Sequence, residues 1–152
     1  MQIISTPIGY AHNNRKKPLD DNWSSVTTTI TLNPDIPIEA LDGIESFSHL
    51  EIVFFFHLQD ENNVVTGSEH PRENPNWPKT GIFAQRKKAR PNRIGTTMVK
   101  LIKRDGRNLF IGRFDGIDMT PILDIKPVFN EFMPGEPIRQ PSWVSEMMNQ
   151  YW

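Results

Sequence analysis

Hydrophobic and polar residues alternate along several short segments of this chain, and turn-forming residues separate the segments. Between residues 26 and 32 apolar side chains alternate with threonines, which predicts a strand with one buried face. Residues 49–57 are too apolar to leave a face in water, so they predict a strand covered on both sides. The segments 96–103 and 108–114 flank Asp105-Gly106, which indicates a hairpin because both residues tolerate a positive φ.

Residues 122–128 predict one more strand. Side chains alternate between the two faces of a strand, so Leu123 and Ile125 should point one way. Asp124 and Lys126 should then point the other way, with their charges on the polar face.

Shorter signals complete the pattern. Residues 81–84 predict a short strand, and residues 38–44 suit one helical turn. Near the end of the sequence Pro141 suits the first position of a helix. Four residues after it share one face at helical spacing: Val144, Met147, Met148 and Tyr151. Together the segments predict a β-rich barrel with short helices at its ends, in one domain spanning residues 1–152.

Composition supports this fold and excludes several functions. The 13 prolines and nine glycines argue against a helix bundle, and the absence of cysteine excludes disulfides and thiolate metal sites. No glycine-rich dinucleotide or phosphate-loop motif occurs, and the four histidines lack the spacing of metal ligands. The first residues do not resemble a signal peptide, and the longest apolar run, residues 52–56, is too short to cross a bilayer. We therefore expect a cytoplasmic protein without a metal and without a membrane segment.

Charge is distributed unevenly along the chain. The net charge is −1, yet residues 79–107 hold ten basic residues and one acid, a local charge of +9. A field of this kind attracts polyanions such as RNA. The alternative is a solvated basic face that acidic neighbours balance in the fold.

Three segments hold the candidate chemistry. The first, residues 81–95, is a basic loop that turns at Pro91-Asn92, where arginines could grip a phosphate and Asn92 could contact a base edge. The alternative is a basic surface turn. The second, residues 115–127, gathers carboxylates that suit a cationic ligand. Its alternatives are a turn with side-chain-to-backbone bonds and a surface pair between Asp124 and Lys126.

The third segment, residues 47–58, ends with His57 at the point where the buried strand emerges. Here the alternative to function is a hydrogen-bonded histidine at a strand end.

Taken together, three segments resemble the TrmO-type (TsaA-like) family, and the resemblance runs from Pro7 to about Val128. The segments are GIFAQRKKARPNRIG, DGIDMTPILDIKPV and GIESFSHLEIVFFFH, in a chain that opens with a short PIG segment. The resemblance implies an antiparallel β-barrel, S-adenosylmethionine as cofactor and a homodimer. It also implies methylation of the exocyclic amine of a threonylcarbamoylated adenine beside the tRNA anticodon. By position, the family's cofactor contacts fall on His57, Leu58, Arg86, Thr96, Asp115, Gly116, Ile117 and Asp118.

The sequence also departs from the family's pattern. The usual DGTP is here Asp118-Met119-Thr120-Pro121, which places a bulky thioether where the family has glycine. The usual RPNPIG has Arg93 in place of its second proline. The C-terminal domain of longer members has no counterpart here. These changes affect the tRNA assignment more than the cofactor assignment.

The mechanism that we expect is direct methyl transfer to an amine. Asp124 is the candidate base, and Lys126 or a loop arginine would pair with the acceptor's carboxylate. The residues expected to contact nucleic acid are Lys87, Lys88, Arg90, Asn92 and Arg93. Two alternatives stay open: a non-catalytic RNA-binding barrel, and a methyltransferase that acts on a small molecule or a protein amine.

Overall fold

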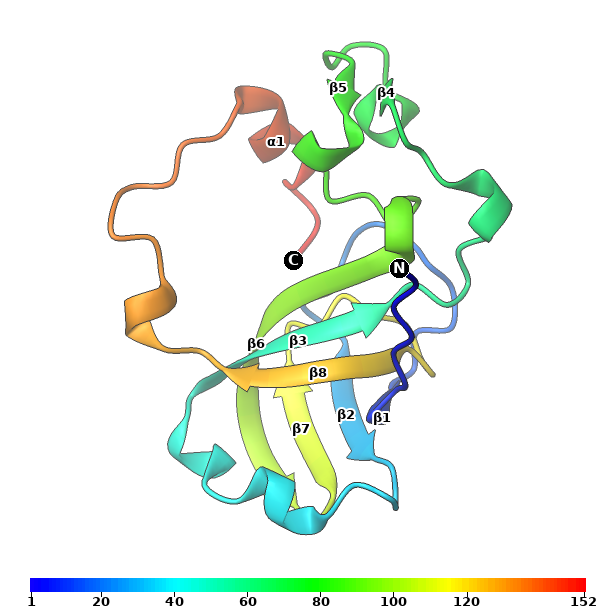
Figure 1. Ribbon diagram of the computed structural model, residues 1–152. Coiled ribbons are helices and arrows are strands. Elements are labelled where there is room, and N and C mark those ends of the chain that lie inside the picture. The colour runs from blue at the N-terminus through cyan, green and yellow to red at the C-terminus, as the bar shows by residue number, and fades with distance from the viewer.

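The computed structural model describes residues 1–152 and contains a closed barrel of antiparallel strands in the order β1-β2-β7-β6-β3-β8 (Figure 1). The barrel strands are β1 (Gly9–His12), β2 (Thr27–Leu32), β3 (His49–Phe55), β6 (Ile94–Asp105), β7 (Asn108–Gly112) and β8 (Pro121–Pro127). A separate two-stranded sheet pairs β4 (Ser68–Glu69) with β5 (Thr80–Gly81). The predicted fold class, a mainly β antiparallel barrel with short peripheral helices, is confirmed.

The helical elements are short and lie outside the barrel. The one α-helix is α1 (Ser142–Met147). The 3-10 helices are Ile38–Leu41, Ile44–Ser46, Glu61–Asn63, Pro71–Glu73, Ile82–Ala84, Pro91–Arg93 and Asn130–Phe132. No helix has the length and hydropathy needed to span a bilayer.

The barrel core follows from the alternation in the sequence. Thr28, Ile30 and Leu32 of β2 are buried, as the pattern of residues 26–32 predicts. Near one end of the core the Phe54 ring meets the rings of Phe56 and Phe114 edge-on, with centroids 5.2 and 5.1 Å away. These aromatic rings fill the barrel beneath the loops that follow β3 and precede β6 and β8.

The alternation predicted for residues 122–128 is confirmed from Asp124 to Lys126, with Ile125 inward and both charges outward, but it fails at Leu123. A register shift between Val53 and Phe54 of β3 pairs Val53 with Asp124 but Phe54 with Ile122. Leu123 is the extra residue of this bulge, so Ile122 and Ile125 both pack on the core.

Two other predictions need smaller corrections. Residues 82–84 form a 3-10 turn and not a strand, because β5 ends at Gly81. The last helix begins at Ser142 with Pro141 as its N-cap and ends at Met147, so Met148 and Tyr151 of the predicted face lie beyond it, and the residue that it buries is Trp143. The hairpin is confirmed, but its two-residue loop is Gly106-Arg107, because Asp105 pairs with Asn108; of the predicted pair only Gly106 has a positive φ, +56°.

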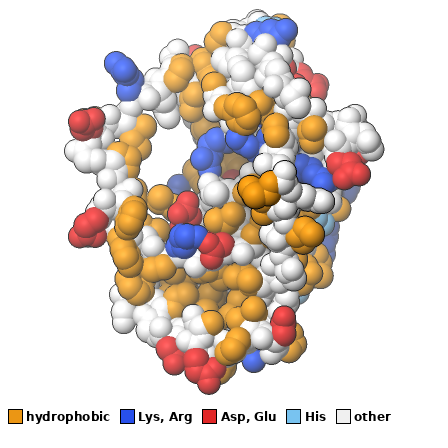
Figure 2. Space-filling model, in the orientation of Figure 1, with side chains coloured by type: hydrophobic (Ala, Val, Ile, Leu, Met, Phe, Trp, Pro, Cys, Tyr) orange, Lys and Arg blue, Asp and Glu red, His pale blue; other side chains and the backbone are white.

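Residues 128–141, which we call the arch, leave β8 and swing away from the barrel before reaching α1 (Figure 1). The space-filling view shows an opening between the arch and the barrel, bordered by hydrophobic side chains (Figure 2). On the arch itself Phe132 is 83% exposed and Ile138 is 77% exposed. The arch therefore presents apolar surface that this single chain does not cover.

Candidate functional site

The carboxylate of Asp115 is held by hydroxyl groups from two distant parts of the chain. Thr97, on the inward face of β6, donates to one oxygen, and the phenol of Tyr151 donates to the other. Burial raises the pKa of the Tyr151 phenol well above its usual range, the Asp115 charge adds to the rise, and the nearby Arg86 guanidinium opposes it. Asp115 is thus a fixed carboxylate with a cationic side chain close by.

Arg86 links this cluster to the outer face of the barrel. Its guanidinium donates to the backbone oxygen of Thr96, whose side chain points outward because Gly95 and Thr97 point inward. In the strand register Thr96 lies opposite Val53, and Val53 lies opposite Asp124. These three residues form a row across β6, β3 and β8, about 10 Å from end to end.

A second carboxylate, Asp118, lies in the same loop as Asp115. It accepts a hydrogen bond from the backbone N–H of Asn13 at 3.0 Å and forms an ion pair with Lys16. Its pKa is lowered, first by the hydrogen bond from Lys16 and also by the bond from Asn13. Near it the pKa of His57 is lowered by burial, which the hydrogen bond to Phe55 and the charge of Asp118 partly oppose. His57 is therefore neutral at pH values near 7.

Close packing explains one glycine in each of two of the three segments, Gly95 and Gly116. A Cβ at Gly95 would lie 2.5 Å from the Phe54 ring, and one at Gly116 would lie 2.4 Å from the Phe114 ring. The turn at Pro91–Arg93 and the turn at 115–118 consequently sit directly on the aromatic end of the core.

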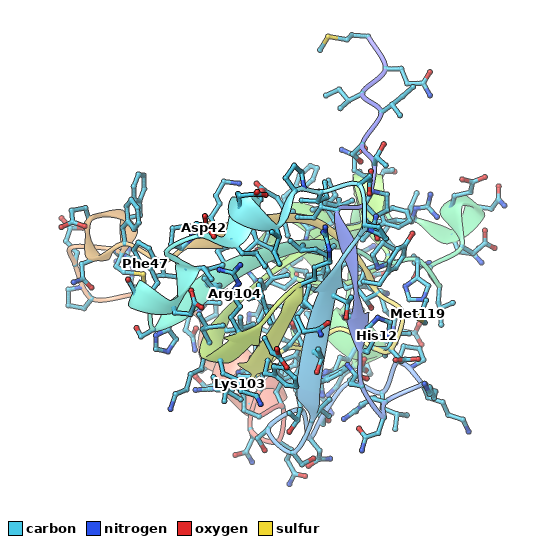
Figure 3. The ribbon with its side chains drawn as sticks, turned by 90° about the horizontal axis from the view of Figure 1, so that it is seen from below. His12, Asp42, Phe47, Lys103, Arg104 and Met119 are labelled. Atoms are coloured by element: carbon cyan, nitrogen blue, oxygen red, sulfur yellow. The ribbon has the colours of Figure 1, made fainter.

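Met119 has the backbone conformation of a glycine. Its φ is +62°, a region that disfavours side chains with a Cβ, and its N–H donates to the Ala11 oxygen at 2.7 Å. It lies near His12 at the edge of the barrel, and its side chain is 48% exposed (Figure 3). The DGTP-to-DMTP departure is thus a strained position at the rim of the candidate site.

The basic loop makes more internal contacts than its sequence implies. Lys87 forms an ion pair with Glu69, and Lys88 lies 3.7 Å from Asp20. Acidic neighbours thus balance part of the charge, as the alternative interpretation proposes. Lys88 keeps 40% of its side chain exposed, so its ammonium group still reaches solvent.

The other predicted nucleic-acid contacts shape the loop. Arg90 donates to the Gln85 oxygen at 3.0 Å, and Arg93 donates to the Gln59 oxygen at 2.8 Å. Asn92 has φ +64°, which an asparagine in a tight turn tolerates. These residues fix the turn that precedes β6.

The remaining predicted residues divide between surface and core. Asp124 and Lys126 contact each other on the outer face of β8, with about half of each side chain exposed. Leu58 is 61% exposed, whereas the side chain of Ile117 is buried beside Trp23. Any cofactor contact by Ile117 would come from its backbone.

Sequence reasoning missed the partners of the two carboxylates. Strand alternation could have placed Thr97 inward once Thr96 was placed outward. Lys16, Asn13 and Tyr151 carry no local signal, because Lys16 reaches Asp118 across 102 positions and Tyr151 reaches Asp115 across 36.

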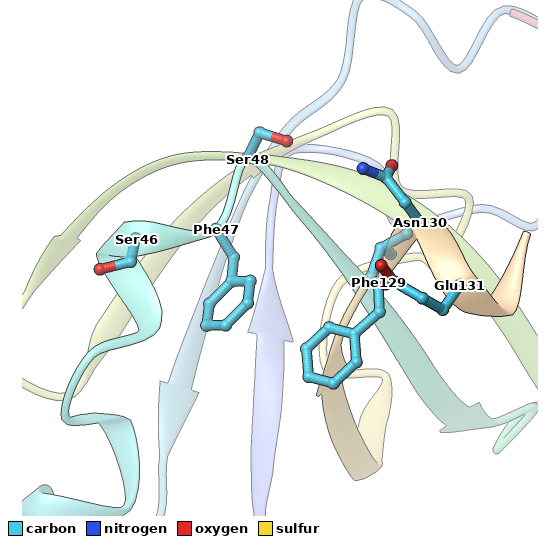
Figure 4. A pocket seen from close by; sticks show the side chains of 7 residues that line it. Ser46, Phe47, Ser48, Phe129, Asn130 and Glu131 are labelled. Carbon is cyan, nitrogen blue, oxygen red and sulfur yellow. The ribbon is translucent and has the colours of Figure 1, made fainter.

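Two grooves lie toward the other end of the barrel. One, of about 300 Å³, lies between Phe47 and Phe129, whose rings stack with centroids 5.7 Å apart (Figure 4). The other, of about 370 Å³, includes Asp124 among mostly apolar residues. At this end the Arg104 guanidinium forms an ion pair with the Asp42 carboxylate, with 3.6 Å between nitrogen and oxygen (Figure 3). None of the predicted cofactor contacts lines either groove.

The barrel order, the basic turn before β6 and the acidic turn before β8 define a class of small β-barrel proteins with charged loops at one end. The chain belongs to the tRNA-methyltransferase O N-terminal domain family, which matches residues 10–132.

Individual relatives agree with this family. A probable S-adenosyl-L-methionine-binding protein of Pyrococcus abyssi is 35% identical over 91% of this chain and 75% of its own length. The tRNA (adenine(37)-N6)-methyltransferase of Mus musculus is 42% identical over 63% of this chain, but the match spans only 22% of the mouse protein. The crystal structure of TrmO from P. aeruginosa superposes with a TM-score of 0.75 at 27% identity, covering 94% of this chain and 62% of that one.

Proposed function

We propose that this chain is an S-adenosylmethionine-dependent methyltransferase that N-methylates a modified adenine, threonylcarbamoyladenosine, in tRNA. One observation carries the cofactor half of the proposal. The carboxylate of Asp115 is fixed by two hydroxyls, one of them from Thr97, and the Arg86 guanidinium is bonded to the backbone oxygen of the adjacent Thr96. The amino-acid part of S-adenosylmethionine has a cationic ammonium, a cationic sulfonium and an anionic carboxylate, so this pair of opposite charges matches it.

The residues present fit the cofactor in polarity as well as in charge. Besides Asp115 and Arg86, the rim offers the second carboxylate of Asp118, the neutral imidazole of His57 and the exposed apolar side chain of Leu58. The relatives' names, an S-adenosyl-L-methionine-binding protein and a tRNA (adenine(37)-N6)-methyltransferase, support the same assignment.

When bound, S-adenosylmethionine supplies an electrophilic methyl group on a sulfonium. The chain's residues must then hold the acceptor amine in line and remove one proton as the N–CH₃ bond forms and the S–CH₃ bond breaks. Asp124 is our candidate for the proton acceptor, because its carboxylate lies on the outer face in the same row as Thr96. A carbamoyl substituent acidifies the amine, so a carboxylate is a sufficient base. Lys126 beside it would pair with the threonyl carboxylate of the acceptor.

The proposal that the acceptor is RNA rests on the basic loop and on the relatives. Lys87, Lys88, Arg90 and Arg93 follow Arg86 closely in the chain, so a polyanion bound there lies next to the proposed cofactor position. Lys87 and Lys88 would exchange their pairing with Glu69 and Asp20 for phosphate oxygens.

We further propose a homodimer that covers the opening beside the arch. Outward side chains of β6, Ile94, Met98 and Ile102, are each more than 40% exposed, and the arch presents Phe132 and Ile138. Charge is complementary too, because the β6 face carries Lys100 and the arch carries Glu131 and Glu136. A second copy related by a two-fold axis buries both surfaces. It also contributes lining residues to a site that is shallow in a single small barrel.

Titration calorimetry with S-adenosylmethionine is the first test. Binding should be saturable and should raise the melting temperature, because a ligand selective for the folded state stabilises it. Absence of heat and of a thermal shift at about millimolar cofactor would leave the non-catalytic RNA-binding barrel as the better account. A labelled-methyl screen over tRNA, protein and metabolite pools separates the remaining alternative acceptors.

A further inference from the structure

The phenol of Tyr151 reaches Asp115 from outside the part of the chain that matches the family. The matched residues are 10–132, and Tyr151 lies after α1, yet it donates a hydrogen bond to the carboxylate at the centre of the candidate site. Of the two hydroxyls that donate to Asp115, one therefore lies outside the matched residues, and the other, from Thr97, lies within them.

Tyr151 is anchored in the fold and does not rest loosely on the site. Its backbone oxygen accepts a hydrogen bond from the Trp23 N–H at 2.8 Å, and the Gln150 oxygen accepts one from the Asn22 N–H at 2.8 Å. Its ring packs against the buried cluster that contains Trp23 and Ile117. The position of the phenol is consequently set by backbone bonds and by apolar burial, independently of any bond to Asp115.

The segment is also tied down beyond Tyr151. The ring of Trp152 meets the Tyr151 ring edge-on, with centroids 5.1 Å apart. The guanidinium of Arg113, just before the acidic turn, lies 4.8 Å from the Trp152 ring centroid, within the range of a cation–π contact.

We propose that Tyr151 is a positioning residue: with Thr97, it holds the Asp115 carboxylate in the orientation that receives the cationic part of the cofactor. This inference rests on the proposed function. A carboxylate has about four acceptor positions, and the two hydroxyls use two of them, one on each oxygen. The other positions remain for a ligand, and the two hydroxyls prevent the group from rotating.

The opposite role, a plug that competes with the cofactor for Asp115, fits the anchoring less well. A plug must leave when the ligand binds, but swinging the phenol away removes a partly buried ring from its packing against Trp23 and Ile117. A fixed donor that remains in place orders the carboxylate before binding, which reduces the entropy cost of binding.

Tyr151→Phe tests the proposal because it removes only the hydroxyl and keeps the ring. Calorimetry should show S-adenosylmethionine binding weakened about tenfold, the effect of losing a hydrogen bond to a charged group. The melting temperature of the free protein should fall by only roughly a few degrees, because the ring packing and the backbone bonds are kept. Tyr10→Phe, at the chain's other tyrosine, is the matched control and should bind normally.

Two further variants separate positioning from packing. In Asp115→Asn the added Tyr151→Phe change should have little further effect on cofactor affinity, because both substitutions act on one interaction. If wild type binds the cofactor and Tyr151→Phe binds it equally well or more tightly, the positioning role is overturned. If wild type binds no cofactor, the proposed function itself fails and this inference fails with it.

Discussion

The Lys16 ammonium group pairs with the Asp118 carboxylate, which joins the segment after β1 to the loop that precedes β8. The Asp118 side chain is only 15% exposed, and the backbone N–H of Asn13 donates to it as well. The charged form of Asp118 therefore has two favourable partners in the folded protein and none in the unfolded chain.

This pair predicts a dependence of stability on pH. The pKa of Asp118 is lower in the folded state, so its contribution is present above the unfolded value, about 3.9, and is lost as pH falls through the folded value. At about pH 7 we expect Asp118→Asn to lower the free energy of unfolding by up to about 1 kcal/mol, a modest figure because water screens the exposed Lys16. Urea unfolding at several pH values measures the difference.

The difference between Asp118→Asn and wild type should shrink as pH falls through the folded pKa of Asp118, because the protonated carboxyl is then neutral like the amide. A difference that stays constant from neutral to acid pH would show that Asp118 contributes through its shape and not through its charge.

Met119 makes a second prediction. Its φ of +62° costs energy that glycine does not incur, and its half-exposed side chain buries little apolar surface. Met119→Gly should stabilise the protein by about 0.5 kcal/mol. Met133→Gly is the matched control, since Met133 is similarly exposed, at 40%, but has φ −79°, and it should be destabilising. Equal losses of stability in both variants would refute the strain at Met119.

The strands were predictable where burial has a simple period. In residues 26–32 every second side chain enters the core, so a one-residue error in register would expose the whole buried set. The same rule failed in residues 122–128, because the bulge opposite Val53 and Phe54 depends on β3, a strand about 70 residues away in the chain.

The candidate site was predictable only in part, for a related reason. The acidic turn and the basic loop are continuous in sequence, so their composition identified them. Their partners lie elsewhere in the sequence. Lys87 contacts Glu69, and Asp115 contacts Tyr151, only after the barrel has closed. No local pattern encodes which charges pair across loops, so charge counted along residues 79–107 overstated the free positive charge.

The outer face of β6 supplies a third prediction. Met98→Asp combined with Ile102→Asp should convert a dimer to a monomer, because burying unpaired carboxylates at an interface is costly. Light scattering at tens of micromolar gives the mass. Leu19→Asp, at a residue 62% exposed outside β6 and the arch, should leave the dimer intact. A wild-type protein that is already monomeric at this concentration would contradict the proposed dimer.

The fourth prediction concerns Asp124. If its carboxylate accepts the amine proton, Asp124→Asn should slow methyl transfer about 100-fold or more while cofactor affinity stays within a few fold. Glu51→Gln is the control, since Glu51 is opposite Lys126 on the neighbouring strand and lies on the same outer face. Comparable single-turnover rates for Asp124→Asn and wild type would remove Asp124 from the mechanism.

The fifth prediction concerns the basic loop. Replacing Lys87, Lys88 and Arg90 with alanine should abolish tRNA methylation and leave cofactor affinity within a few fold. The dependence of log affinity on log salt should become shallower by up to about three, one for each lost phosphate contact. Lys103→Ala, on the hairpin side of β6, is the control and should change little. Arg86→Ala should weaken both cofactor and RNA binding, because Arg86 borders the Asp115 cluster.

Transfer of a labelled methyl group from S-adenosylmethionine to tRNA is the most direct test of the proposed activity. Wild-type protein should place the label on the exocyclic amine of an adenosine in tRNA that carries the threonylcarbamoyl group, and the rate should fall steeply as salt rises. Label that instead enters a small molecule or a protein, at a rate insensitive to salt and unchanged by the triple alanine substitution, would contradict the tRNA assignment.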